Sequence, residues 1–151
     1  MNVEQILRNK GSRVITIRPQ LTLTDAAAAL GLHHIGALVV SDESDPILGI
    51  LSERDIVKAI AARGSHALSE TVAANMTKDV IVCTGEATLI DILELMTNKK
   101  FRHMPVIENE RLIGLISQGD IVKYRMAQIE AEHDEMIDYI TTAGEKHVSP
   151  S

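Results

Sequence analysis

Two short stretches of the sequence place a serine three residues before an aspartate, directly after an apolar run. They are Gly49–Asp55 (GILSERD) and Gly114–Asp120 (GLISQGD). Each stretch is predicted to end a strand and begin a helix, where free backbone N–H groups and the helix dipole favour an anion. The serine hydroxyl can add a donor, and the carboxylate can accept from two neighbouring hydroxyls, such as those of a ribose. The pattern therefore fits a nucleotide-binding site.

The same spacing is also that of a helix capping box. In this interpretation Ser52 and Ser117 are N-caps, while Asp55 and Asp120 occupy the third helical position. A cap would be duplicated together with the fold around it. The repetition of the motif therefore does not choose between a cap and a binding site.

Both motifs belong to a sequence that repeats itself. Val14–Ile17 recurs as Val80–Cys83, and Gly49–Lys58 recurs as Gly114–Lys123 after a slip of one residue. Two copies of a unit of about 60 residues indicate an internal duplication rather than a longer repeat array.

Each copy is predicted to fold as strand, helix, strand, strand, helix. The strands are expected at 14–17, 37–40 and 47–51 in the first copy and at 80–83, 104–107 and 112–116 in the second. A small sheet with helices on one side leaves an apolar face that a second unit can cover. The predicted fold class is therefore α/β (α+β), with two tandem β-α-β-β-α repeats packed sheet to sheet.

The helices follow from apolar spacing and from their end signals. Leu89, Ile92, Leu93 and Met96 share one face of a helix. The matching helix of the first copy, 26–30, is expected to end at Gly31. A closing helix runs from near Ser52 to Arg63 and stops at Gly64.

The predicted organisation has four parts and two short helical lead-ins. The parts are a first repeat (1–63), a linker (64–71), a second repeat with a helical extension (72–142) and a flexible tail (143–151), and the lead-ins are 3–7 and 72–76.

The composition narrows the possible functions. The net charge is −6 and aromatic residues make up only 2%, which argues against binding to nucleic-acid phosphates or stacked bases. A single cysteine excludes an internal disulfide. We expect a cytoplasmic protein, because the sequence contains neither a signal-peptide pattern nor a long apolar run.

The repeated Gly-φ-φ-Ser-x-x-Asp motif, where φ is an apolar residue, together with Phe101–Val106 (FRHMPV), resembles the cystathionine-β-synthase-type (CBS) domain. Two tandem copies resemble a stand-alone Bateman module, and the resemblance covers about residues 3–128. It implies a regulatory, non-enzymatic module that binds AMP, ADP, ATP or NAD(H) in clefts between the repeats and signals by conformational or oligomeric change. No required cofactor, metal or catalytic residue is implied.

The resemblance assigns roles to positions of this sequence. The two aspartates, Asp55 and Asp120, are expected to hold ribose hydroxyls, and Ser52 and Ser117 to contact phosphate or ribose. Each cleft is lined from both repeats, so that Asp120 is expected to face Ile15, Thr16, Gly36 and Ala37, and Asp55 to face Ile81, Val82, Arg102 and His103. Aliphatic side chains are expected to enclose the adenine.

The two clefts are not expected to be equivalent. Arg54 corresponds to Gly119, and Gly36–Ala37 corresponds to Arg102–His103. The cleft with Asp55 is therefore predicted to prefer a phosphate-rich ligand through charge-assisted bonds from its arginines. The cleft with Asp120 is predicted to take a leaner adenosine group.

The last helix continues past the repeat with a heptad pattern formed by Val122, Met126, Ile129, His133, Met136 and Ile140. This pattern predicts either a helix that lies on its own domain or one that pairs with a second copy, and we expect a homodimer. The expected partners are an adenosine-containing small molecule and an unknown regulated protein, without membrane or nucleic acid. The alternatives are a dimeric scaffold without ligand and, with less support, a nucleotide hydrolase using Asp55 or Asp120.

Overall fold

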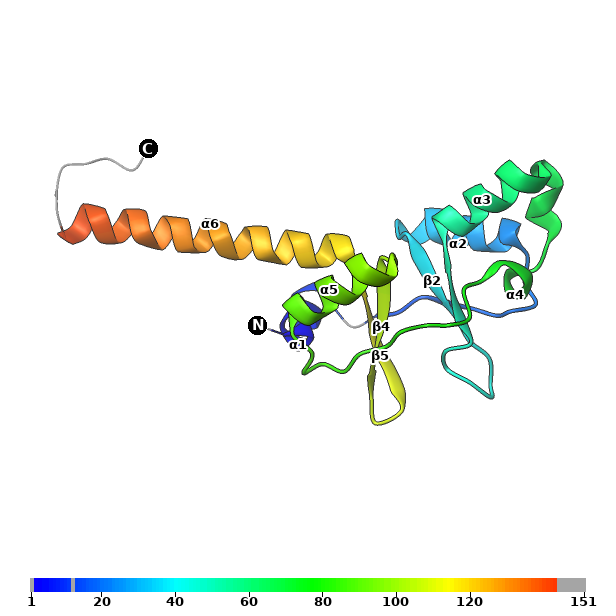
Figure 1. The fold of residues 1–151 in the computed structure, drawn as a ribbon, viewed down its shortest axis with the longest axis horizontal. Coiled ribbons are helices and arrows are strands. Elements are labelled where there is room, and N and C mark those ends of the chain that lie inside the picture. The colour runs from blue at the N-terminus through cyan, green and yellow to red at the C-terminus, as the bar shows by residue number, and fades with distance from the viewer. Residues whose placement is uncertain (1, 12, 144–151) are drawn as a thin grey trace.

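The structure is a computed structural model that describes residues 2–11 and 13–143. The tail predicted at 143–151 lies, except for its first residue, outside the described residues. The elements fall into two halves that stand side by side, and one long helix extends away from them (Figure 1).

The first half contains a three-stranded sheet covered by two helices. β1 (Thr16–Ile17) runs parallel to β2 (Ala37–Val40), and β2 pairs antiparallel with β3 (Gly49–Ser52). The helices are α2 (Leu23–His33) and α3 (Glu53–Arg63). The expected order of strand, helix, strand, strand, helix is confirmed, although the first strand is shorter than the predicted 14–17.

The second half repeats this order with α5 (Leu89–Lys99), β4 (His103–Glu108), β5 (Arg111–Ser117) and α6 (Gln118–Ala143). β4 and β5 form an antiparallel pair. The strand predicted at 80–83 is wrong in its extent: only Cys83 pairs, through a single parallel bridge to Val106. Before Cys83 the chain turns, with a bond from Val80 N–H to Lys78 C=O, and then borders a cavity instead of a strand.

The predicted end of the second helix at Gly31 is also wrong. α2 continues through this glycine to His33 and ends at His34, whose φ of 54° is left-handed. A glycine inside a helix costs about 1 kcal/mol relative to alanine. The last turn is closed instead by the His34 N–H, which donates to the Leu30 carbonyl oxygen.

Three short helices connect the two halves: α1 (Val3–Lys10), η1 (Ser65–Ser69) and α4 (Val72–Asn75). The lead-in helices predicted at 3–7 and 72–76 are thereby confirmed, and α1 is longer than expected. The boundaries given above for the two repeats (1–63 and 72–142) and for the linker (64–71) remain predictions.

Each lead-in helix packs on the core of the opposite half. Val3, Ile6 and Leu7 of α1 are buried with the side chains of α5, β4 and β5. Val72 of α4 is buried with the side chains of the first half. Each of these two helices therefore ties one half to the other.

Two glycines show how closely the lead-in segments approach the sheets. A methyl group on Gly49 would lie 2.6 Å from the Thr77 carbonyl oxygen, whereas one on Gly114 would meet the Leu7 side chain at 2.6 Å. We expect Gly49→Ala to lower the free energy of unfolding by about 1–3 kcal/mol, because backbone must move. Gly114→Ala should cost less, since Leu7 can change rotamer. Urea unfolding of both variants checks this, and equal losses would contradict it.

Candidate functional site

The first Ser-x-x-Asp motif forms a complete capping box at the start of α3. The Asp55 N–H donates to Ser52 Oγ at 3.3 Å, and Asp55 Oδ2 accepts from the Ser52 N–H at 2.8 Å and from its hydroxyl at 3.1 Å. Among the described residues, the other carboxylate oxygen, Oδ1, has no hydrogen-bond partner. The cap therefore leaves one oxygen of Asp55 available to a ligand.

The second motif caps α6 in the same way. The Asp120 N–H donates to Ser117 Oγ at 3.0 Å, and Asp120 Oδ2 accepts from the Ser117 N–H at 2.9 Å. This oxygen is also bonded to the ammonium group of Lys10 from α1, which forms an ion pair with the carboxylate. Burial raises the pKa of Asp120, but the bonds from Lys10 and Ser117 outweigh burial and leave that pKa below its usual value. The capping interpretation is therefore realised in both copies.

A large cavity of about 1350 Å³ lies between the two halves, and we call it the Asp55 cleft. The residues of the site predicted from sequence that line it are Gly36, Ser52, Arg54, Asp55, Ile81, Arg102, His103, Ser117 and Gly119. The predicted residues that do not line it are Ile15, Thr16, Ala37, Val82 and Asp120. The structure thus gathers the residues expected around Asp55, together with Gly36, Ser117 and Gly119, which were expected in the other cleft.

The Asp55 cleft carries more positive than negative side chains. Its cationic residues are Arg54, Lys58, Lys99, Lys100, Arg102 and Lys123, and its acidic residues are Glu53, Asp55, Asp79 and Glu130. This surplus contrasts with the net charge of −6 of the whole chain. A cavity with such walls attracts anions more strongly than the rest of the protein surface does.

The four lysines of the cleft were missed by the sequence reasoning. A usable signal existed for Lys58 and Lys123, because both end the repeated stretch and follow the capping aspartate by one helical turn. Lys99 and Lys100 end α5, where Lys100 has a left-handed φ of 58°. No pattern in the sequence indicates that this turn faces the cleft.

The apolar part of the Asp55 cleft comes from several elements. Ile50 belongs to β3, Val80 and Ile81 precede Cys83, and Val122 and Met126 belong to α6. Phe101 also lines the cavity. The wall is therefore not purely aliphatic, whereas the sequence predicts aliphatic side chains around the adenine.

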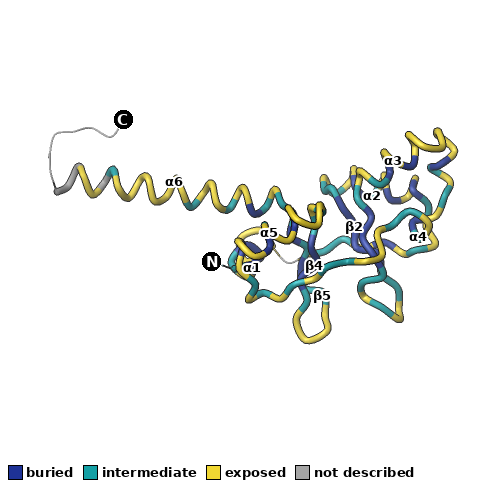
Figure 2. The backbone as a smooth tube through the Cα atoms, viewed as in Figure 1, coloured by how far each residue is buried: buried dark blue, intermediate teal, exposed yellow. Residues whose placement is uncertain are grey.

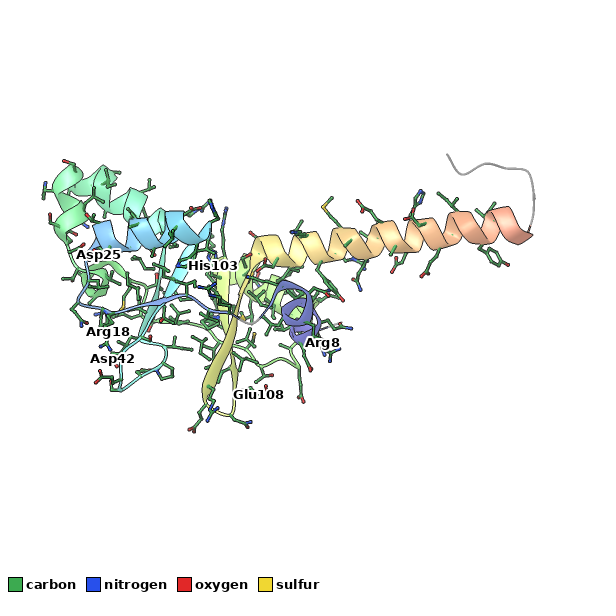
Figure 3. The ribbon with its side chains drawn as sticks, turned by 180° about the vertical axis from the view of Figure 1, so that it is seen from behind. Arg8, Arg18, Asp25, Asp42, His103 and Glu108 are labelled. Carbon is green, nitrogen blue, oxygen red and sulfur yellow. The ribbon has the colours of Figure 1, made fainter. Side chains whose placement is uncertain are left out.

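His103 lies at the boundary between the halves (Figure 3). A Cβ atom on Gly36 would be 3.5 Å from its Nε2 and 3.7 Å from Glu53 Oε1. Burial lowers the pKa of His103, as do the charges of Lys10 and Arg102, while those of Asp120 and Glu53 raise it. The net direction is downward, so the imidazole stays neutral at a pH where a free histidine is protonated.

This lowered pKa predicts a pH dependence of stability. The unfolded chain binds a proton at His103 below a pH of about 6.5, whereas the folded chain resists it, so stability falls as pH decreases through that range. We expect His103→Gln to lose less stability than the wild type between about pH 7.5 and 5.5. Urea unfolding at both pH values measures this, with the exposed His66→Gln as the control. An unchanged pH dependence in His103→Gln would contradict the assignment.

The described residues contain neither a metal-binding cluster nor a helix that could span a membrane. Among them, no group of three or more His, Cys, Asp or Glu side chains is placed to hold a metal ion. Within the same part of the chain, every helix is too short or too polar to cross a membrane. Burial raises the pKa of the Cys83 thiol to about 11, so this cysteine is a poor nucleophile.

Comparison with known proteins shows which family this fold and this site define. The family model described as "CBS domain" matches twice, at residues 3–62 and 70–127. The chain belongs to the CBS domain family, with two tandem copies of the domain. The expected α/β fold of two repeats with a C-terminal helix is thereby confirmed.

Individual relatives support this membership. The chain is 45% identical to the CBS-domain containing protein ATU1752 from Agrobacterium tumefaciens, with a TM-score of 0.80 over 83% of this chain and 99% of that one. It is 33% identical to the mitochondrial CBS domain-containing protein CBSX3 from Arabidopsis thaliana, over 79% of this chain but only 60% of that protein.

A third relative was solved with ligands. The CBS domain pair of protein MJ0100, in complex with 5′-methylthioadenosine and S-adenosyl-L-methionine, is 25% identical. Its TM-score is 0.75 over 85% of this chain and 98% of that chain. That pair therefore binds ligands that contain an adenosine group.

Proposed function

We propose that this chain is a regulatory module that binds an adenosine-containing ligand in the Asp55 cleft. The observation that carries the proposal is the placement of Asp55, with one carboxylate oxygen outside the cap, in a cation-rich cavity between the two halves. The complex of the related MJ0100 pair supports an adenosyl ligand. AMP, ADP, ATP and NAD(H) all fit this chemistry, and the surplus of cations favours those with more phosphate groups.

The shape of the cleft supports a ligand of nucleotide size. Small-molecule pockets in proteins usually measure about 300–1000 Å³, so a cavity of about 1350 Å³ admits a nucleotide with several phosphates or a dinucleotide. The ribose would face Asp55, the phosphates would face the arginines and lysines, and Ile81 and Phe101 would contact the base.

A calorimetric titration tests the proposed function. The purified protein is titrated with adenosine, AMP, ADP, ATP, NAD(H) and S-adenosylmethionine. We expect binding in the micromolar range, tighter for the ligands with more phosphates. The absence of heat with every ligand, confirmed by equilibrium dialysis, would leave both motifs as caps and the protein as a scaffold without ligand.

Arg102 provides a specific prediction about phosphate. We expect Arg102→Ala to weaken ADP binding by about ten-fold, because one charge-assisted hydrogen bond is lost. Binding of adenosine, which has no phosphate, should stay unchanged. Arg111→Ala on the exposed hairpin, outside the cleft, is the matched control. Equal losses for ADP and adenosine would mean that Arg102 shapes the cleft instead of binding phosphate.

We also propose that the chain forms a homodimer through α6. This helix extends beyond the body of the protein and most of its length is exposed (Figure 2). Its exposed apolar residues include Val122, Met126, Ile129, Met136 and Ile140, the apolar positions of the predicted heptad. A row of this kind on a helix with few other contacts fits a helix that pairs with its copy.

The mode of signalling follows from the position of α6. Val122 and Met126 belong both to the wall of the Asp55 cleft and to the exposed apolar row. A ligand that contacts them differently in monomer and dimer would shift the equilibrium between the two forms. A regulatory role, a cytoplasmic location and an as yet unidentified regulated protein complete the proposal.

A further inference from the structure

The two capping aspartates differ in one contact that the repeat does not predict. Lys10, the last residue of α1, donates from Nζ to Asp120 Oδ2 and, at 2.8 Å, to the Leu115 carbonyl oxygen. The Lys10 and Asp120 side chains are 38% and 23% exposed, so the pair is partly withdrawn from water. Such a pair is screened less than one on the open surface, but it is exposed enough to be weakened by salt.

The lysine leaves Asp120 with little capacity to accept further bonds. Oδ2 of Asp120 already accepts from the Ser117 N–H and from Lys10, and one carboxylate oxygen has two lone pairs in its plane. Two neighbouring hydroxyls of a ribose are held best when both carboxylate oxygens can accept. Oδ2 accepts two protein bonds at both aspartates, but the second donor differs: at Asp55 it is the Ser52 hydroxyl, which can rotate toward a ligand, whereas at Asp120 it is the Lys10 ammonium group, which also neutralises the carboxylate.

Among the described residues, Asp55 is paired with no comparable cation. The lead-in helix of its half, α4, has four residues, whereas α1 has eight. Because α4 ends early, the chain continues as an extended segment that pairs with β3, where Thr77 and Ile50 exchange two backbone bonds at 2.9 and 3.0 Å. Within the described residues no ion pair involves Asp55, and the partners of its Oδ2 are the Ser52 N–H and hydroxyl.

The lysine is held in place by a well-anchored helix. Val3, Ile6 and Leu7 of α1 are buried in the second core, and the Val3 N–H donates to the Ala87 carbonyl oxygen at 3.0 Å. Gly11 ends the helix directly after Lys10, with an N–H bond to the Leu7 carbonyl oxygen. The backbone position of Lys10 is therefore set by the packing of α1 on the second core, which includes Ile121 beside Asp120.

The residues expected to form a second cleft with Asp120 are divided in the structure, because Gly36, Ser117 and Gly119 line the Asp55 cleft. Asp120 itself does not line the Asp55 cleft, and its carboxylate is paired with Lys10 instead. We infer that Lys10 is a specificity-determining residue that occupies the Asp120 carboxylate in place of a ribose, so that each chain binds one adenosyl ligand instead of two. This inference rests on the proposed function.

The test uses 5′-methylthioadenosine, because this neutral ligand presents the adenosine group without a phosphate that Lys10 could attract. In an Asp55→Ala background, only the Asp120 position is left to hold a ribose. We expect weak binding of this probe to Asp55→Ala and at least about ten-fold tighter binding, with one site per chain, when Lys10→Met is added. Arg8→Met in the same background is the matched control, since Arg8 pairs with Glu4 on the outer side of α1.

The outcomes separate the inference from the proposed function. Equal affinity of Asp55→Ala with and without Lys10→Met, while the wild type binds ADP, would overturn the role of Lys10 and keep the proposed function. Two equal sites in the wild type would also overturn it. No binding of any adenosyl ligand to the wild type would overturn both.

A second measurement does not depend on the Lys10 variant. Salt weakens the ion pair between Lys10 and Asp120. It does not weaken binding of the probe directly, because 5′-methylthioadenosine carries no phosphate charge. Raising the salt concentration should therefore tighten binding of 5′-methylthioadenosine to Asp55→Ala. Weaker or unchanged binding at high salt would contradict the inference even if the lysine variant failed to fold.

Discussion

Asp55→Ala is expected to weaken binding of ADP by about 100-fold, the largest loss of any single substitution in the cleft. A carboxylate that accepts from two ribose hydroxyls makes two charge-assisted bonds, each worth about 1.5–3 kcal/mol. Isothermal titration of wild type and variant with ADP measures the change. The same substitution also removes one half of the α3 capping box, so the protein should lose about 1 kcal/mol of stability.

Asp25→Ala separates the two roles. Thr22 and Asp25 form the same reciprocal box at the start of α2, with bonds of 3.0 and 3.2 Å. Asp25 lies at the opposite end of α2 from His103 and outside the Asp55 cleft (Figure 3). The two variants should therefore be destabilised to a similar extent in urea unfolding, while only Asp55→Ala loses binding. If Asp55→Ala and Asp25→Ala both change ADP binding only slightly and to the same extent, Asp55 acts only as a helix cap.

The capping motifs and the repeated order of elements could be predicted from sequence because they depend on residues close together in the chain. A serine and an aspartate three positions apart form their bonds within one helical turn, whatever packs around them. The same locality explains why the closing helix was predicted to end at Gly64, as it does. Gly31 shows the limit of the rule, since α2 continues past this glycine to His33 and ends at His34, which takes the left-handed conformation.

The parts that could not be predicted depend on packing between distant segments. Nothing near Val3 in the sequence indicates that α1 belongs to the core of the second half. The contact between Lys10 and Asp120 follows from that packing and joins residues 110 positions apart. The strand expected at 80–83 failed for the same reason, because Val80 and Ile81 border the cleft between the halves instead of pairing with β4.

Ile129→Glu and Met136→Glu together are expected to raise the dissociation constant of the dimer by at least about 100-fold. Both side chains are exposed in the single chain, at 49% and 63%, and neither lines the cleft. Burying such a side chain contributes about 1.5–3 kcal/mol, and each substitution acts twice in a symmetric dimer. Sedimentation equilibrium of wild type and double variant measures the change.

Ala131→Glu is the matched control for the dimer, because residue 131 is exposed and lies on the face of α6 opposite the apolar row. It adds a charge to the helix without placing it between two apolar rows, so the dissociation constant should stay unchanged. A wild type that sediments as a monomer would exclude pairing through α6. If the control dissociates the dimer as strongly as the double variant, charge on the helix, and not the apolar row, governs association. Separately, nucleotide binding by a monomeric double variant would show that the Asp55 cleft is complete within one chain.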